Sequence, residues 1–136
     1  MKIMAVDLGL QRTGLAVCDE LELLASPIGT INQPDPDKLC EEIAAMAQRD
    51  GVREIVVGHP RNMDGSCGES AQRAEAFAAA LEQASGLPVK LRDERLTTVS
   101  AHGILNQTNV RGKKRKAVVD TVSATIILQD YLDSRR

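Results

Sequence analysis

The sequence has almost no aromatic residues. Its 136 positions include one Phe, one Tyr and no Trp. A core built from this chain must therefore be aliphatic, and any nucleic-acid surface on it has no row of aromatic rings on which bases could stack. A chain of this length is expected to form one domain that buries a core without disulfide bonds.

Cysteines are also few, and their spacing is irregular. Cys18, Cys40 and Cys67 are an odd number and match no zinc-binding pattern, which argues against a disulfide framework and for a reducing compartment. Cys18 and Cys40 are expected in the core, and Cys67 is expected to be the most exposed thiol. No charged-then-apolar leader opens the sequence, and no apolar run approaches the roughly 18 residues of a membrane span. We therefore expect a cytoplasmic protein that does not contact membranes.

Positive charge is scarce except near the C-terminus. The formal net charge is −2. Residues 1–110 carry ten Lys or Arg against sixteen Asp or Glu, whereas residues 111–136 carry seven against three. Five of these cations form one basic run, which consists of Arg111, Lys113, Lys114, Arg115 and Lys116. Such a run is either a solvated loop or a phosphate-binding one, and its place just before Asp120 favours phosphate binding.

The hydrophobic pattern predicts a mixed α/β architecture. Apolar runs bounded by turn residues predict strands at 3–8, 14–18, 21–31, 54–57 and 89–91. Helical spacing predicts helices from 34–37 to residue 50, at 70–84, at 98–105 and at 117–132. Three strands joined by tight turns, followed by strand–helix alternation, are typical of a five-stranded sheet with helices on its faces. No repeat or linker is visible, so we expect one domain over residues 1–136.

Three acidic positions stand out: Asp7, Glu94 and Asp120. Asp7 closes the apolar run 3–6, Glu94 follows the apolar stretch 87–91, and Asp120 lies in the last helical segment. Stability does not explain a carboxylate at the end of an apolar strand, because burying an unpaired charge is costly. If the three acids converge, a hard divalent cation makes the cluster tolerable and can activate water against a phosphodiester. The acids therefore favour a metal-dependent nuclease.

Asp120 shares a helix face with apolar residues. It precedes Ala124, Ile127, Leu128 and Tyr131 at helical spacing, which predicts that position 120 faces the sheet. The alternative is that Asp120 lies in the first helical turn and pairs with the helix dipole. Pairing with the helix dipole does not require Asp120 to lie on the inward-facing apolar stripe. Its place on that stripe therefore favours a functional role.

Two glycine-containing loops are candidate phosphate contacts. In the turn after Asp7, Gly9 permits close backbone approach and Arg12 can bind phosphate oxygens, although a simple hairpin explains the same glycines. A second loop, residues 58–68, leaves a strand just before a helix, where backbone amides can receive anions. His59 in that loop is either a proton shuttle or a bystander.

Four blocks of this sequence resemble the YqgF/RuvX family. They are Asp7-Leu8-Gly9 with Arg12, Gly14 and Ala16; Val57-Gly58 with Pro60 and Asn62-Met63-Asp64-Gly65; Asp93-Glu94-Arg95-Leu96-Thr97-Thr98; and Lys116 with Asp120, Ile127-Leu128-Gln129 and Tyr131-Leu132. The blocks span nearly the whole chain. The sequence departs from the family at His59 and Arg61, where Leu is usual, and at Ser123, where Ala is usual.

The resemblance implies an RNase H-like fold in which Asp7, Glu94 and Asp120 are the metal-binding catalytic acids. It also implies a nuclease that processes pre-16S rRNA, with a Holliday junction resolvase acting on branched DNA as the alternative. Such an enzyme would hold one or two Mg²⁺ or Mn²⁺ ions. Gly9, Arg12, Arg95 and the basic run would bind the nucleic-acid backbone, and we expect a monomer or a weak homodimer.

Two other classes of function are compatible with parts of the pattern. A non-catalytic RNA-binding factor in ribosome assembly would also present basic and acidic clusters. The turn after Asp7 also resembles the phosphate loop of actin-like ATPases and sugar kinases. Those proteins close two lobes over a nucleotide, and 136 residues leave no room for a second lobe.

Overall fold

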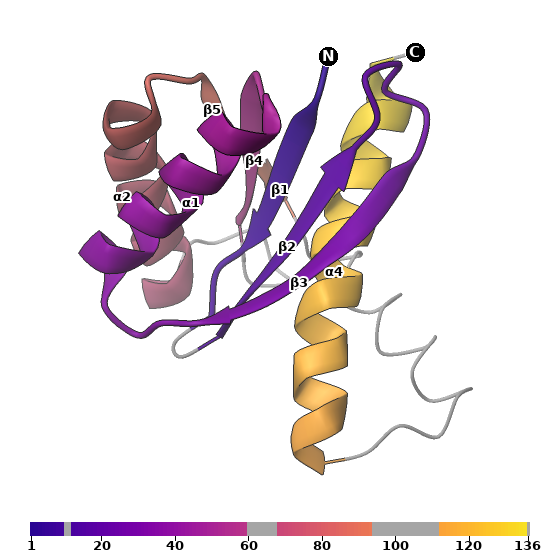
Figure 1. The fold of residues 1–136 in the computed structure, drawn as a ribbon. Coiled ribbons are helices and arrows are strands. Elements are labelled where there is room, and N and C mark those ends of the chain that lie inside the picture. The colour runs from indigo at the N-terminus through magenta and orange to yellow at the C-terminus, as the bar shows by residue number, and fades with distance from the viewer. Residues whose placement is uncertain (10–11, 60–67, 94–111, 136) are drawn as a thin grey trace.

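The computed structural model describes residues 1–9, 12–59, 68–93 and 112–135, and for residues 93 and 112–121 it describes the backbone alone. Figure 1 shows a sheet with helices on both faces. The elements in chain order are β1 (Ile3–Asp7), β2 (Arg12–Cys18), β3 (Ala25–Asn32), α1 (Pro36–Asp50), β4 (Glu54–His59), α2 (Glu69–Ser85), β5 (Val89–Asp93) and α4 (Gly112–Ser134).

The five strands form one mixed sheet in the order β3-β2-β1-β4-β5. β1, β2 and β3 pair antiparallel, as tight turns require, whereas β1, β4 and β5 run parallel through helical crossovers. The predicted five-stranded mixed sheet with flanking helices is confirmed. We call the edge where the three parallel strands end the carboxyl edge, and the edge where they begin the amino edge.

Alternation along the strands divides the core into two layers. Met4 and Val6 of β1 join the cluster beneath α1 and α2, whereas Ile3 and Ala5 join the cluster beneath α4. Successive side chains of a strand point to opposite faces, so a buried strand needs apolar residues at every position. The continuous apolar run of β1 follows from its central place in the sheet.

The two helices on one face end as the sequence predicts. Asp35 caps α1 by accepting hydrogen bonds from the backbone N–H groups of Asp37 and Lys38. Gly51 and Gly86 end α1 and α2 in the left-handed conformation, with φ of 74° and 70°. Only glycine adopts that conformation without strain, which is why these positions stop the helices.

The third strand begins later than predicted. β3 starts at Ala25 rather than at residue 21, because the Asp19 carboxylate accepts hydrogen bonds from the N–H groups of Leu23 and Leu24, at 2.9 and 3.0 Å. These bonds close a turn, and Glu22 within it has a φ of 58°. The apolar pattern of residues 21–24 was therefore misleading, since these leucines are exposed.

The last helix begins earlier than predicted, at Gly112 rather than at residue 117. Residues 113–116 of the basic run are therefore helical, and the prediction of a loop there is wrong. Asp120 is the ninth residue of α4, which places it in the third turn. The helix predicted at 98–105 lies outside the described residues. In the part of the chain that the structure describes, no helix is long and apolar enough to cross a membrane.

Candidate active site

Asp7 ends β1 at the carboxyl edge and is partly buried. It continues the alternation of Ile3 and Ala5, whose side chains pack against α4, so its carboxylate lies on the α4 face of the sheet. Its neighbour on β2 is Gly14. Gly14 therefore adds no side chain beside the Asp7 carboxylate.

The turn after Asp7 requires a glycine. A Cβ atom added to Gly9 would lie within van der Waals overlap of the backbone oxygen of Arg12, so this position tolerates no side chain. This close approach within the chain explains why position 9 is glycine. Arg12 opens β2 two residues before Gly14, so alternation places its side chain on the same face as Asp7.

α4 crosses the face of the sheet that carries Asp7. Ala124, Ile127, Leu128 and Tyr131 are buried against the strands, which confirms the apolar part of the predicted stripe. The helix runs from the carboxyl edge toward the amino edge, where the Tyr131 hydroxyl donates to Glu54 at 3.0 Å (Figure 1). Position 120 precedes Tyr131 by about 16 Å of helix, and Asp7 follows Ile3 by about 13 Å of strand. Both acids therefore belong to the carboxyl-edge half of the molecule.

The remaining predicted site residues are outside the described structure. Glu94, Arg95 and Arg111 are not described, and for Lys113, Lys114, Arg115, Lys116 and Asp120 only the helical backbone is. Within the described residues, no group of three or more His, Cys, Asp or Glu side chains could hold a metal ion. The convergence of Asp7, Glu94 and Asp120 therefore remains a prediction.

His59 lies on the other side of the sheet from Asp7. Its Nε2 atom is 3.1 Å from the Glu75 carboxylate on α2, and its side chain is 12% exposed. Alternation explains the orientation, because Val57 of the same strand packs into the cluster beneath α1 and α2. This pairing favours a structural role for His59 over a proton shuttle at Asp7.

Cys18 and Cys40 are buried, as expected. Burial raises the pKa of both thiols, so neither is poised as a nucleophile. Cys67 lies outside the described residues.

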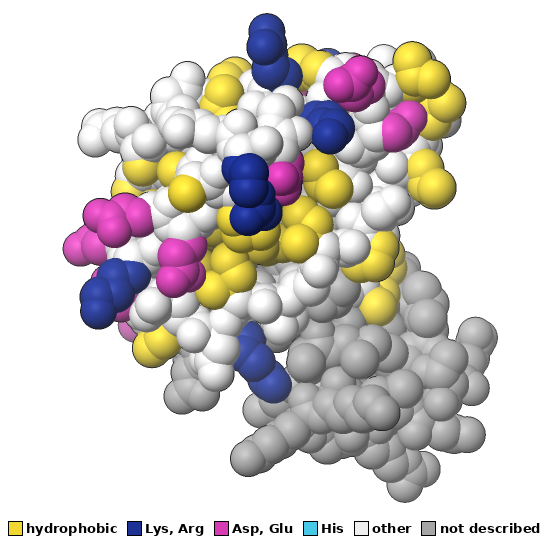
Figure 2. All heavy atoms as spheres, in the orientation of Figure 1, with side chains coloured by type: hydrophobic (Ala, Val, Ile, Leu, Met, Phe, Trp, Pro, Cys, Tyr) yellow, Lys and Arg dark blue, Asp and Glu magenta, His cyan; other side chains and the backbone are white. Residues whose placement is uncertain are grey.

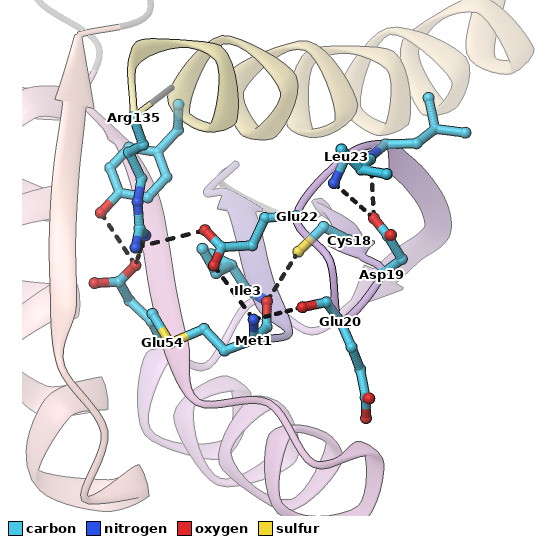
Figure 3. A network of polar contacts seen from close by, with 11 residues as sticks. Met1, Ile3, Cys18, Asp19, Glu20, Glu22, Leu23, Glu54 and Arg135 are labelled. Atoms are coloured by element: carbon cyan, nitrogen blue, oxygen red, sulfur yellow. Dashed lines mark hydrogen bonds and ion pairs between the residues drawn. The ribbon is translucent and has the colours of Figure 1, made fainter.

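Sequence reasoning missed one buried acid, Glu54, at the amino edge. Its side chain is only 4% exposed and contacts Tyr131 at 3.0 Å, Arg135 at 2.8 Å and Lys90 at 3.2 Å. Figure 3 shows how Arg135 links Glu54 to Glu22, which also pairs with the amino group of Met1. Because protein groups supply its counter-charges, Glu54 is structural. The sequence did contain one signal for this residue, because Glu54 is an acid at the start of the apolar strand 54–57.

The turn between β2 and β3 does not suit phosphate. Its surface gathers the exposed side chains of Leu21, Leu23 and Leu24 beside the acids Asp19 and Glu20. In Figure 2 hydrophobic and acidic side chains lie together at the upper right, where Figure 1 places this turn. Acidic side chains repel the phosphate backbone, so this turn is a poor candidate for a nucleic-acid site.

Comparison with solved structures identifies the fold. RuvC of Thermus thermophilus, solved with a Holliday junction substrate, superposes with a TM-score of 0.59 at 14% identity, covering 99% of this chain and 96% of that one. The Holliday junction resolvase of fowlpox virus gives a TM-score of 0.58 at 15% identity, with both chains fully covered. This likeness establishes the RNase H-like fold.

Comparison of sequences identifies the family. A protein of Lachnospira eligens named "Putative pre-16S rRNA nuclease" is 43% identical and covers 100% of this chain and 99% of its own. A protein of the same name from Geobacillus kaustophilus is 43% identical, with both chains fully covered. The family model described as "RuvX: Holliday junction resolvase" matches residues 1–134. The chain therefore belongs to the RuvX family.

Proposed function

We propose that this protein is a metal-dependent nuclease that hydrolyses phosphodiester bonds in pre-16S rRNA during ribosome biogenesis. The observation that carries the proposal is the place of Asp7, at the carboxyl edge, on the face covered by α4 and beside Gly14. The family and the names of the relatives support the same reaction class.

Asp7, Glu94 and Asp120 would together hold the cation. Glu94 directly follows β5, and the side chains of Lys90 and Arg92 on that strand contact Glu54 and α4. A continued alternation would bring the Glu94 carboxylate to the same face as Asp7. Three carboxylates form a hard oxygen donor set, which suits Mg²⁺ or Mn²⁺. A bound ion there would supply a Lewis acid that activates water and neutralises developing charge.

The start of α4 supports a functional reading of both Asp120 and the basic run. A helix dipole favours acids only within about the first turn, and Asp120 is in the third turn, so dipole pairing does not explain it. Cations at a helix N-terminus are unfavourable by roughly 0.3–1 kcal/mol each. Lys113, Lys114 and Arg115 occupy that position, which supports a proposed role in binding rather than in stability.

We propose that the basic run, together with Gly9, Arg12 and Arg95, binds the phosphate backbone of the substrate. Arg12 can reach phosphate oxygens beside Asp7, because both side chains lie on the α4 face. Such contacts position a nucleic acid without reading its sequence. We infer that the protein works as one domain, monomeric or weakly dimeric, in the cytoplasm, where its substrate is made.

Cleavage of two defined substrates by the purified protein tests the proposal. One substrate is an RNA with the 5′ precursor end of 16S rRNA, and the other is a four-way DNA junction, each incubated with Mn²⁺ or with chelator. We expect Mn²⁺-dependent cleavage of the RNA by the wild type and none by Asp7→Asn. Cleavage of the junction alone would make the protein a resolvase. Binding of RNA without cleavage under any metal would make it a non-catalytic assembly factor.

A further inference from the structure

A cavity of about 320 Å³ lies on the face of the sheet opposite α4. It is enclosed by the segment after β1, the start of α1 and the first half of α2. Its walls are largely apolar and include Leu8, Pro34 and Phe77. Cavities that bind small ligands begin at about this volume and combine apolar walls with a few polar groups.

One polar group in this cavity lacks a partner. The Nε atom of Arg73 is buried and has no hydrogen-bond partner within the described structure. A buried N–H donor without an acceptor is unfavourable. The unpaired Nε atom of Arg73 therefore favours binding of a ligand that supplies an acceptor. The guanidinium group also carries a positive charge.

A second polar group in the lining offers an acceptor. Asp37 lies in the first turn of α1, but the helix cap is Asp35, whose carboxylate accepts the hydrogen bond from the Asp37 N–H at 3.0 Å. The Asp37 carboxylate is therefore not needed to cap the helix. The cavity thus combines apolar walls with one cationic donor and one anionic acceptor, a set that suits a flat polar heterocycle better than a hydrocarbon.

The cavity adjoins the segment that carries Asp7, the proposed catalytic acid. Leu8 and Gly9 line it and directly follow Asp7 in the chain. Alternation places Asp7 on the α4 face and Leu8 on the other face, where it packs against the larger core cluster. The cavity therefore lies just across the sheet edge from Asp7.

We propose that this cavity binds an unstacked guanine base of the substrate, an inference that rests on the nuclease function proposed above. Guanine presents the O6 and N7 acceptors that arginine recognises, and its N–H donors can reach a carboxylate. Proteins read single-stranded RNA by removing bases from the stack and covering their faces. The apolar walls of the cavity would cover the faces of the base. They would replace the aromatic rings that this chain almost entirely lacks.

Binding of mononucleotides in chelator tests the proposal without any cleavage. GMP, AMP, CMP and UMP are titrated into the wild-type protein and followed by calorimetry. All four carry the same phosphate, so a difference in affinity reports the base. We expect GMP to bind at least about tenfold more tightly than UMP, because a good paired contact discriminates by that factor or more.

Two variants and one matched control locate the binding site. Arg73→Leu removes the donor, and Ala76→Leu fills the cavity from an exposed position of α2 that lines it. Ala79→Leu makes the same change at an exposed position of α2 outside the lining. We expect the first two to weaken GMP binding at least about tenfold, since each removes the contact or the space. The control should bind as the wild type does.

Equal affinity for all four nucleotides would overturn the proposal, and so would unchanged GMP affinity in Ala76→Leu. Binding of decanoate with no preference among nucleotides would show that the cavity takes an apolar ligand instead. Failure of the nuclease proposal is distinguishable: in that case GMP binds as expected while the precursor RNA remains uncut. If the RNA is cut but no nucleotide preference appears, only the base site is wrong.

Discussion

Two carboxylates on the α4 side of this sheet show what an acid beside an apolar strand can mean. Glu54 opens β4 at the amino edge, and the hydroxyl of Tyr131 and the cations of Arg135 and Lys90 surround it. Its carboxylate in turn raises the pKa of Lys90. Asp7 closes β1 at the opposite edge, beside a glycine, in the half of the molecule that holds the start of α4.

The comparison of Glu54 with Asp7 shows that burial alone does not identify an acid that binds a metal ion. An acid next to an apolar strand is unfavourable only if nothing in the protein neutralises it. For Glu54, Lys90 of β5 and Arg135 just after α4 provide the positive charges, so its burial indicates a structural role. For Asp7, we propose a divalent cation beside the carboxylate. Substitutions at the two edges should therefore change different properties, stability at the amino edge and catalysis at the carboxyl edge.

The largest expected difference is in cleavage. Asp7→Asn, Glu94→Gln and Asp120→Asn should each reduce Mn²⁺-dependent cleavage by about 100-fold or more, because each removes a charge that the ion and transition state require. Glu54→Gln should cleave at the wild-type rate. Single-turnover rates with the precursor RNA measure both effects. Near wild-type cleavage by all three carboxyl-edge variants would exclude the proposed metal site.

Stability should depend on the acid at the amino edge, Glu54, rather than on the acids at the carboxyl edge. Glu54→Gln should lower the free energy of unfolding by about 2 kcal/mol, since charge-assisted hydrogen bonds to a buried carboxylate are lost. The melting temperature should fall by roughly 6–10 °C. Asp130→Asn is the matched control, because its partner Arg92 lies at the surface and such pairs contribute about 0–1 kcal/mol. Equal losses in the two variants would show that burial of Glu54 adds nothing.

The basic run should affect binding but not folding. Replacing Lys113, Lys114 and Arg115 with Ala should weaken RNA binding for all sequences alike. Each lost phosphate contact should flatten the slope of log affinity against log salt by about 0.7–0.9. The control replaces Lys38 and Arg53, exposed cations elsewhere on the surface, and should leave the slope unchanged. The same slope for both variants would mean that the start of α4 is not the binding surface.

A smaller effect should appear in chelator. Without an ion the three acids repel each other, so Asp7→Asn should raise the free energy of unfolding by about 1 kcal/mol and the melting temperature by a few degrees. Added Mg²⁺ or Mn²⁺ should reverse the order, since the ion stabilises only a protein that binds it. Thermal scans with and without metal measure this reversal. A lower melting temperature for the variant in chelator, with no metal effect on the wild type, would show that the acids share no cation.

The smallest effect concerns the acidic turn between β2 and β3. Hydrogen bonds from the N–H groups of Leu24 and Leu23 lower the pKa of Asp19. Because the folded pKa is below the unfolded one, this contribution is present above the unfolded pKa and is lost as pH falls through the folded pKa. A carboxyl NMR titration should therefore place Asp19 below an ordinary Asp, and Asp19→Ala should speed amide exchange at both leucines. An unshifted titration would contradict the hydrogen bonds between the Asp19 carboxylate and the two leucine N–H groups.

The strand pattern predicted most of the fold, because alternation and apolar runs report burial directly. The buried stripe of α4 was also predictable, since Ala124, Ile127 and Leu128 recur at helical spacing. Residues 21–24 were misassigned because Leu21, Leu23 and Leu24 look apolar in a pattern, whereas the Asp19 carboxylate turns the backbone before a strand can form. The start of α4 was missed because a run of cations disfavours a helix N-terminus.

The sequence by itself determined the sheet, its helices and the family, since these follow from periodicity, capping residues and long motif blocks. Only the tertiary structure decided which acids have which surroundings. Glu54 opens an apolar strand and Asp7 closes one, and only the structure shows that Tyr131 and Arg135 reach Glu54. It also decided that His59 faces Glu75 rather than Asp7. Such pairings join residues far apart in the chain, and no local pattern records which side chains meet in space.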